Sequence, residues 1–217
     1  MVICVAGPIA AGKNFVCSIL EERGFFCLDA DQEIHKIISD KQAEIFSRFS
    51  QIAASRGINL CAADGSLDRR ALGKLLFKDR TLLAEQEKIL YPEFVARVQA
   101  LIDANNNALQ AQEGGVTEIA GKPKLARGLA INAALLYKTP SLLRQCQKII
   151  YVDAPLLVRA WRIRRRDRLP LLQIIRRIKS QKGLLQEYKR FAADYGIEMV
   201  RVWNWGKKAC QTLEGLS

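Results

Sequence analysis

The sequence predicts an α/β fold built around a largely parallel sheet. Short, fully apolar segments alternate with helical stretches along the chain, and the first apolar segment runs into a glycine-containing turn and then a helix. The 217 residues, 49% of them hydrophobic, have an ordinary globular composition. We therefore expect one domain over residues 1–217 with a core of its own.

Apolar runs and turn residues locate the expected elements. The expected strands are Val2–Ala6, Phe25–Leu28, Leu129–Leu136, Ile149–Val152 and Met199–Val202. The expected helices are 14–23, 32–57, 68–77, 82–90, 92–103 and a long helical region over 156–193. Pro92 is expected to separate two helices, because proline breaks the helical hydrogen-bond ladder. Asparagines and glycines over 104–125 indicate a polar surface insertion.

Hydropathy and cysteine content indicate the cellular compartment and whether a membrane partner is expected. No apolar run approaches the roughly 18 residues of a membrane helix, and the short apolar start lacks the basic region of a signal peptide. The six cysteines include no C-x-x-C pair, so free, mostly buried thiols are expected. We expect a cytoplasmic protein with no membrane partner.

The segment Gly7-Pro8-Ile9-Ala10-Ala11-Gly12-Lys13-Asn14 matches the phosphate-binding loop G-x-x-x-x-G-K-[ST] except at its last position. Glycines let the backbone approach phosphates closely, and the helix N-terminus supplies a positive dipole. The Lys13 ammonium would reach the terminal phosphates. The alternative is a β–α turn with a chance lysine, but an apolar strand before the loop and a helix after it favour ATP binding.

Asn14 stands where a Ser or Thr hydroxyl normally ligates Mg²⁺. An amide carbonyl oxygen is also a hard, neutral ligand. We therefore expect Asn14 to bind the metal directly or through water.

Two carboxylates, Asp29 and Asp31, follow the second expected strand. Open α/β sheets bind ligands at the carboxyl edge of parallel strands, where the phosphate loop also ends. A carboxylate there can accept the proton of an attacking hydroxyl or hold a water on magnesium. The alternative for either residue is a helix cap, which Asp favours.

These motifs and several further segments together resemble the dephospho-coenzyme A kinase family over nearly the whole chain. The most characteristic is the D-G-x-L-x-R-R-x-L-G block at Asp64–Gly73, followed by Phe77 and Tyr91-Pro92. The remaining matches are Ala134-Leu135-Leu136, Ile150–Pro155, Arg162–Asp167, Gln181 and Asn204-Trp205-Gly206.

The resemblance implies a three-layer, nucleotide-kinase-like P-loop fold with a five-stranded parallel sheet, substrate-binding helices and a helical lid at about 159–182. It implies transfer of a phosphoryl group from ATP, with Mg²⁺, to the ribose 3′-hydroxyl of dephospho-CoA, the last step of coenzyme A synthesis. The implied catalytic residues are Asp31, Lys13 and Arg162. The implied nucleotide-binding residues are Gly7, Ala10, Ala11, Gly12, Lys13, Asn14, Phe15, Arg162, Arg166 and Asn204. The implied substrate-binding residues are Asp31, Arg69, Arg70 and Leu135.

The chain departs from the family pattern at several positions. Besides Asn14, Tyr91 stands where His usually precedes Pro, and Ala134 and Lys138 stand where Pro and Glu usually begin and close the P-L-L-x-E segment. These departures indicate a divergent branch. A different P-loop kinase for a nucleoside or small alcohol, and a nucleotide-binding protein without activity, remain alternatives.

The formal charge of +12 is densest in the arginines between residues 159 and 168. Arg162 and Arg166 would share one helix face and close over the transferring phosphoryl group. Nucleic-acid binding would instead spread basic residues along a face with interleaved aromatics. Trp161 is expected in the core and Trp205 either stacks on adenine or packs, so we expect no nucleic-acid partner.

Overall fold

The computed structural model describes residues 1–77, 79–113 and 127–205. The chain divides into two compact units. The sheet unit consists of Met1–Ala30 and Gln99–Ser217, and the helical unit is Asp31–Val98. Within the described ranges no helix is long and apolar enough to cross a membrane.

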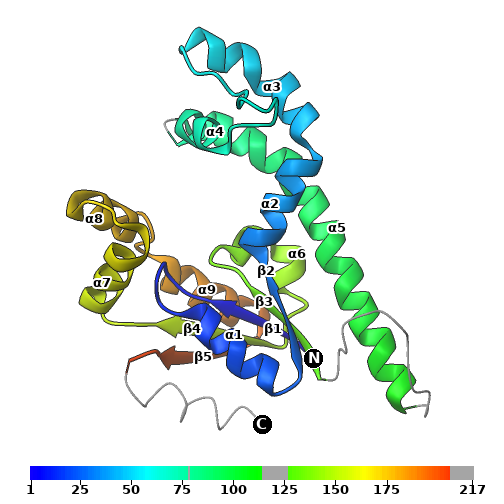
Figure 1. The fold of residues 1–217 in the computed structure, drawn as a ribbon. Coiled ribbons are helices and arrows are strands. Elements are labelled where there is room, and N and C mark those ends of the chain that lie inside the picture. The colour runs from blue at the N-terminus through cyan, green and yellow to red at the C-terminus, as the bar shows by residue number, and fades with distance from the viewer. Residues whose placement is uncertain (78, 114–126, 206–217) are drawn as a thin grey trace. The chain divides into compact units, whose positions relative to one another are not determined.

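The sheet unit contains five parallel strands in the order β2-β3-β1-β4-β5 (Figure 1). They are β1 (Val2–Ala6), β2 (Phe25–Asp29), β3 (Gly128–Asn132), β4 (Lys148–Asp153) and β5 (Glu198–Trp203). Every residue of β1 and β3 is buried, which explains why both read as continuous apolar runs. All five expected strands are present, but β3 ends at Asn132 instead of continuing to Leu136.

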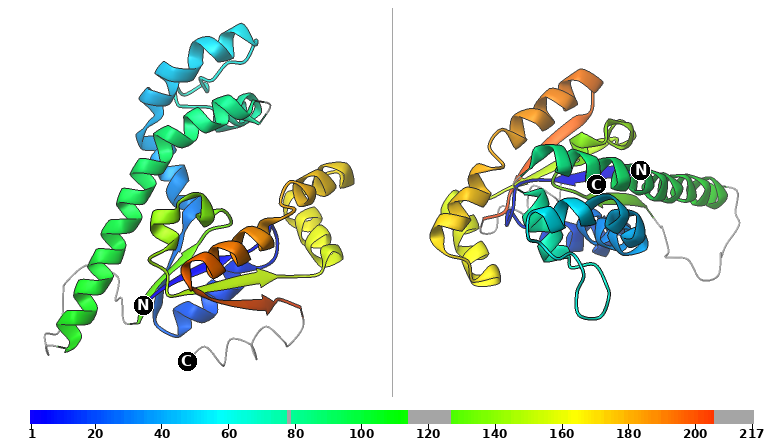
Figure 2. Two further views of the ribbon diagram at one scale, coloured as in Figure 1. Left: turned by 180° about the vertical axis from the view of Figure 1, so that it is seen from behind. Right: turned by 90° about the horizontal axis from the view of Figure 1, so that it is seen from above.

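Helices cover both faces of this sheet. Helix α1 (Lys13–Glu22) packs Val16 and Leu20 against one face. Helix α9 (Leu184–Tyr195) lies on the opposite face. The left view of Figure 2, turned by 180° from Figure 1, shows it in front of the strands. The buried Tyr188 of α9 stacks edge-on with Tyr151 of β4. The expected three-layer α/β arrangement is therefore confirmed.

Two short helices follow β4 before the chain reaches α9. They are α7 (Leu156–Asp167) and α8 (Leu171–Lys179). Three isoleucines, Ile163, Ile174 and Ile178, form a small core between them, and Ile9 and Ala10 pack against it. The residues expected to form a lid therefore pack directly on the segment between β1 and α1.

The helical unit begins within α2 (Ala30–Asp40) and continues through α3 (Gln42–Ser55) and α4 (Arg69–Leu76). The helical stretch expected over 32–57 is present, but a turn at Lys41 divides it into α2 and α3. Helix α4 begins where expected: the side chain of Asp68 accepts hydrogen bonds from the backbone N–H groups of Arg70 and Ala71 and so caps it.

The helix α5 (Arg80–Glu113) runs through Pro92 without ending. The expectation of two helices separated at Pro92 is therefore wrong. A proline inside a helix costs about 3 kcal/mol, but α5 buries a stripe at four-residue spacing on both sides of it. The stripe is Leu82, Gln86, Leu90, Phe94, Val98 and Ile102. Burying each large apolar side chain stabilises by about 1.5–3 kcal/mol, which outweighs the broken hydrogen bond.

The expected insertion at 104–125 is helical in its first part, because α5 continues to Glu113. The remainder, 114–125, lies outside the described residues. Between β3 and β4 the chain forms the short helices η1 (Leu136–Lys138) and α6 (Pro140–Leu143). The expectation of free thiols holds for the described cysteines, although Cys61 is exposed; Cys210 lies outside the described residues.

Candidate active site

The loop between β1 and α1 has a backbone that only glycine fits at two positions. Gly7 has φ +145°, and a Cβ there would lie 2.1 Å from the carbonyl oxygen of Val152. Gly12 has φ +96°, and its Cβ would lie 1.8 Å from Nδ2 of Asn204. Gly7 is therefore required both by its backbone conformation and by the backbone packed against it, and Gly12 by its backbone conformation.

Lys13 is the first residue of α1, and its ammonium Nζ donates a 3.1 Å hydrogen bond to the carbonyl oxygen of Gly7. This contact folds the side chain back over the loop. The N-terminus of α1 and the Lys13 charge therefore act on the same space, which is the arrangement that binds phosphate.

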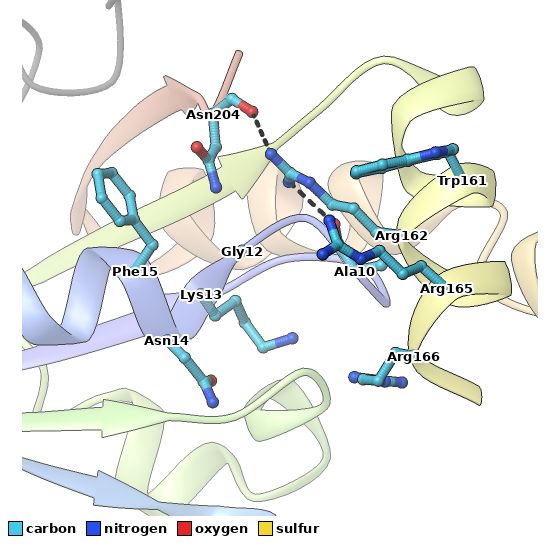
Figure 3. A pocket seen from close by; sticks show the side chains of 10 residues that line it. All are labelled: Ala10, Gly12, Lys13, Asn14, Phe15, Trp161, Arg162, Arg165, Arg166 and Asn204. Atoms are coloured by element: carbon cyan, nitrogen blue, oxygen red, sulfur yellow. Dashed lines mark hydrogen bonds between the residues drawn. The ribbon is translucent and has the colours of Figure 1, made fainter. Parts of the chain in front are cut away.

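A cavity of about 710 Å³ lies beside the loop (Figure 3). It is lined by Ala10, Gly12, Lys13, Asn14, Phe15, Trp161, Arg162, Arg165, Arg166 and Asn204. Eight of these ten residues were expected to bind nucleotide. Gly7 and Ala11, also expected there, are buried in the loop and do not line the cavity. Trp161 and Arg165 were not predicted as site residues.

The side chain of Arg162, on α7, donates hydrogen bonds to main-chain carbonyl oxygens of the loop. Its Nη1 donates to the carbonyl oxygens of Ala10 (3.2 Å) and Ala11 (3.1 Å), and its Nη2 donates to that of Asn204 (3.1 Å). Nδ2 of Asn204 donates to the carbonyl oxygen of Ala11 at 2.9 Å. Arg162 and Asn204 thus join α7, the end of β5 and the loop in one hydrogen-bonded group.

A second pair of side chains fixes Ile9 from both sides. Nε of Arg159 donates to the Ile9 carbonyl oxygen at 3.0 Å, and the Ile9 N–H donates to Oε1 of Gln181 at 2.6 Å. Arg159 is only 8% exposed, and burial lowers its pKa. Arg159 was not predicted as a site residue, because the sequence does not show which arginine of a basic helix is buried. Gln181 was named only through the family resemblance.

Arg166 lines the cavity, but its guanidinium is engaged by its neighbour. Its Nε and Nη2 donate to the two carboxylate oxygens of Asp167, at 2.7 and 3.1 Å. Arg177 of α8 donates to the same carboxylate at 3.0 Å. The hydrogen bond from Arg166 holds the pKa of Asp167 below its usual value, so Asp167 stays ionised between two arginines.

Asn14 contacts the end of β3. Its Oδ1 accepts a 2.9 Å hydrogen bond from Nδ2 of Asn132. Asn132 lies opposite Asp29 of β2 in the parallel register. The edge beside Lys13 therefore gathers two amides and one carboxylate, all of them oxygen ligands of the hard type that Mg²⁺ takes.

The expected substrate-binding residues lie elsewhere on the chain. Asp31, Arg69 and Arg70 belong to the helical unit, where Asp31 is exposed in the first turn of α2 and Arg69 donates to the Ser39 hydroxyl. Leu135 belongs to the sheet unit and is 43% exposed just before η1.

Two tryptophan expectations have different outcomes. Trp161 is 58% exposed and lines the cavity, so its expected place in the core is wrong. The cause is its position on α7, whose buried side is formed by Arg159 and Ile163. Trp205 is 57% exposed, which contradicts packing and leaves adenine stacking as a prediction. Gly206, next in the chain, lies outside the described residues.

Comparison with known proteins agrees with this architecture. A family model for dephospho-CoA kinase matches residues 1–120. A dephospho-CoA kinase from Treponema denticola is 34% identical over 194 residues, covering 89% of this chain and 79% of that protein. One from Treponema pallidum is 36% identical over 181 residues, covering 83% and 78%.

Solved structures share the fold. A protein from Thermus thermophilus matches with a TM-score of 0.67 at 22% identity, covering 100% of this chain and 97% of that one. A dephospho-CoA kinase from Campylobacter jejuni matches with a TM-score of 0.56 at 20% identity, covering 99% and 93%. The five-stranded P-loop fold expected from the sequence is confirmed, and the matches in sequence decide the family. The chain belongs to the dephospho-CoA kinase family.

Proposed function

We propose that this chain transfers the γ-phosphoryl group of ATP to the ribose 3′-hydroxyl of dephospho-CoA. The single observation that carries the proposal is the cavity beside the phosphate loop, in a chain whose relatives over most of its length are dephospho-CoA kinases. Lys13 and the loop amides would hold the β- and γ-phosphates, and the reaction would take place in the cytoplasm, as the sequence predicts.

Phosphoryl transfer is catalysed mainly by positioning and by electrostatic stabilisation. The nucleotide-binding residues expected from the sequence would form the nucleotide site, with Arg162 acting through its hydrogen bonds to the loop and Arg166 through its pairing with Asp167. The segment at about 159–182 would serve as the lid within a single kinase domain. Closing such a segment over the nucleotide excludes water and limits wasteful hydrolysis of ATP.

Asp31 is the residue we propose to orient or deprotonate the acceptor hydroxyl. It follows the carboxyl end of β2 by two residues, and parallel α/β sheets bind their ligands at that edge. Arg69, Arg70 and Leu135 would contact dephospho-CoA.

Mg²⁺ fits the oxygen ligands beside Lys13. Asn132 and Asp29 lie in register on adjacent strands, and Asn14 is hydrogen-bonded to Asn132. These three residues would hold the ion directly or through its waters, as Mg²⁺ keeps several waters in nucleotide sites. Bound there, the ion would neutralise charge on the phosphate oxygens.

The decisive experiment measures ADP release from ATP and Mg²⁺ with and without dephospho-CoA, and determines whether the product gains the mass of one phosphate. We expect ADP release that depends on the acceptor. A panel of nucleosides and small alcohols tests for a different kinase, and ATP binding without turnover on any acceptor would contradict the proposed activity.

A further inference from the structure

Three arginines of α7 line the cavity, and their surroundings differ. Arg162 donates to three carbonyl oxygens, two in the loop and that of Asn204, so most of its N–H groups are engaged within the protein and not with a ligand. Arg166 turns its Nε and Nη2 toward Asp167, and that carboxylate offsets much of its positive charge. Neither arginine presents a fully available guanidinium fork to the cavity.

Arg165 differs from both. The described part of the chain gives its guanidinium no carboxylate or carbonyl partner, and its contact is with the ring of Trp161, 5.5 Å from ring centroid to Cζ. Both side chains are exposed, and both line the cavity. In Figure 3 the Arg165 side chain runs from α7 toward the phosphate loop.

The energies favour transfer of this guanidinium from the ring to a phosphate. A cation–π contact at an exposed site is weak, whereas a bidentate bond from arginine to phosphate is charge-assisted on both sides and much stronger. The ring of Trp161 can therefore hold Arg165 near the loop in the absence of nucleotide without competing effectively with the nucleotide's phosphates.

We propose that Arg165 is the arginine of α7 that binds the polyphosphate of the nucleotide, and that Trp161 holds it in position beforehand. The inference rests on the proposed kinase function and adds a phosphate-binding residue that the sequence pattern did not indicate. Arg162 then serves to fix the loop, and Arg166 to fix the turn between α7 and α8 through Asp167 and Arg177.

The first test is the binding of inorganic tripolyphosphate, which has phosphates but no base, by isothermal titration calorimetry. Arg165→Ala is expected to weaken binding about tenfold or more, as for loss of hydrogen bonds to a charged group. Arg164→Ala is the matched control, because Arg164 is an exposed neighbour on α7 that does not line the cavity. It removes the same charge and is expected to change the affinity less than threefold.

Equal losses in Arg165→Ala and Arg164→Ala would overturn the proposal, because only long-range charge would then be involved. A loss in Arg166→Ala that Arg165→Ala does not show would also overturn it. Arg165→Lys is expected to recover part of the affinity, since it restores the charge without the planar fork.

A second test follows Trp161 itself. In a protein carrying Trp203→Phe and Trp205→Phe, the remaining indole fluorescence comes from Trp161. Tripolyphosphate is expected to change its emission as Arg165 leaves the ring, and Arg165→Ala is expected to abolish that change. An unaltered change in Arg165→Ala would contradict the proposal. Failure of turnover with dephospho-CoA would contradict the proposed function alone, because tripolyphosphate binding does not involve the acceptor.

Discussion

The side-chain amide of Asn132 donates a 2.9 Å hydrogen bond to Oδ1 of Asn14, joining the end of β3 to the start of α1. In P-loop enzymes the corresponding edge commonly holds Mg²⁺ with a Ser or Thr hydroxyl and an Asp carboxylate. Here two neutral amides meet at this edge, with Asp29 beside them in register. The metal dependence of nucleotide binding therefore becomes a property to measure.

Asn14→Ser is expected to strengthen the effect of Mg²⁺ on nucleotide affinity. The substitution removes the hydrogen bond from Asn132 and introduces a hydroxyl that can ligate the ion. The measurement is the ratio of ADP affinities with Mg²⁺ and with a chelator, determined by calorimetry. We expect this ratio to increase several-fold, and an unchanged ratio would show that position 14 does not contact the ion. Asn14→Ala is the control that removes the amide without adding a ligand.

Lys13→Ala is expected to lower kcat by a factor on the order of 10²–10³, the cost of removing one preorganised group from a developing charge. The ammonium lies over the loop through its contact with the carbonyl oxygen of Gly7. The rate is measured as ADP release that depends on dephospho-CoA. Wild-type turnover would contradict the role of Lys13, and an unchanged melting temperature would show that a loss of rate is not a loss of fold.

Asp31→Asn is expected to lower kcat by on the order of 10²–10⁴, as for loss of a general base. The KM for ATP is expected to change less than threefold, because the phosphates are held by the loop. Steady-state kinetics with each substrate varied separates these effects. Equal losses in kcat and in ATP affinity would show that Asp31 acts on the nucleotide and not on the acceptor.

Gly12→Ala is expected to weaken nucleotide binding, because φ there is +96° and the new Cβ, 1.8 Å from Nδ2 of Asn204, would displace the side chain that donates to the Ala11 carbonyl oxygen. Gly57→Ala is the matched control: φ there is also positive, at +67°, but no atom lies within 4 Å of the new Cβ. The control is expected to cost only backbone strain, about 1–2 kcal/mol. Calorimetry with ADP and chemical unfolding measure the two effects; normal ADP affinity in Gly12→Ala would contradict the packing argument.

Glu33 is expected to make the helical unit sensitive to acid. Burial raises its pKa, but hydrogen bonds from Arg97 (3.1 Å) and Lys36 (3.1 Å) outweigh burial, so the pKa lies below its usual value. A carboxyl whose folded pKa is lowered stabilises the protein above its unfolded pKa, about 4.3, and this stability is lost as pH falls through the folded pKa.

Glu33→Gln is therefore expected to reduce the loss of unfolding free energy between pH 6 and acidic pH, measured by urea unfolding. Glu44→Gln is the control, because the Glu44 side chain is 52% exposed and pairs only with its helix neighbour Lys41 among the described contacts. The same pH dependence in Glu33→Gln as in the unsubstituted protein would rule out this contribution.

The amino-acid sequence alone determined the phosphate loop, the family and the presence of all five strands, although not where β3 ends. Buried parallel strands are continuous apolar runs, so Val2–Ala6 was located to the residue. The loop is a contiguous motif whose glycines are needed for the local backbone conformation. Gly7, Gly12 and Lys13 are therefore identifiable from their spacing.

Only the tertiary structure decided how the helices pack and which partner each arginine of α7 contacts. Pro92 lies inside one helix because a buried stripe outweighs a local penalty, and propensity cannot measure that burial. Arg159, Arg162, Arg165 and Arg166 are alike in sequence. They differ because one is buried against Ile9, one holds loop carbonyls, one lies over Trp161 and one faces Asp167. A side chain's partner depends on contacts between segments far apart in the chain, and local sequence does not encode such contacts.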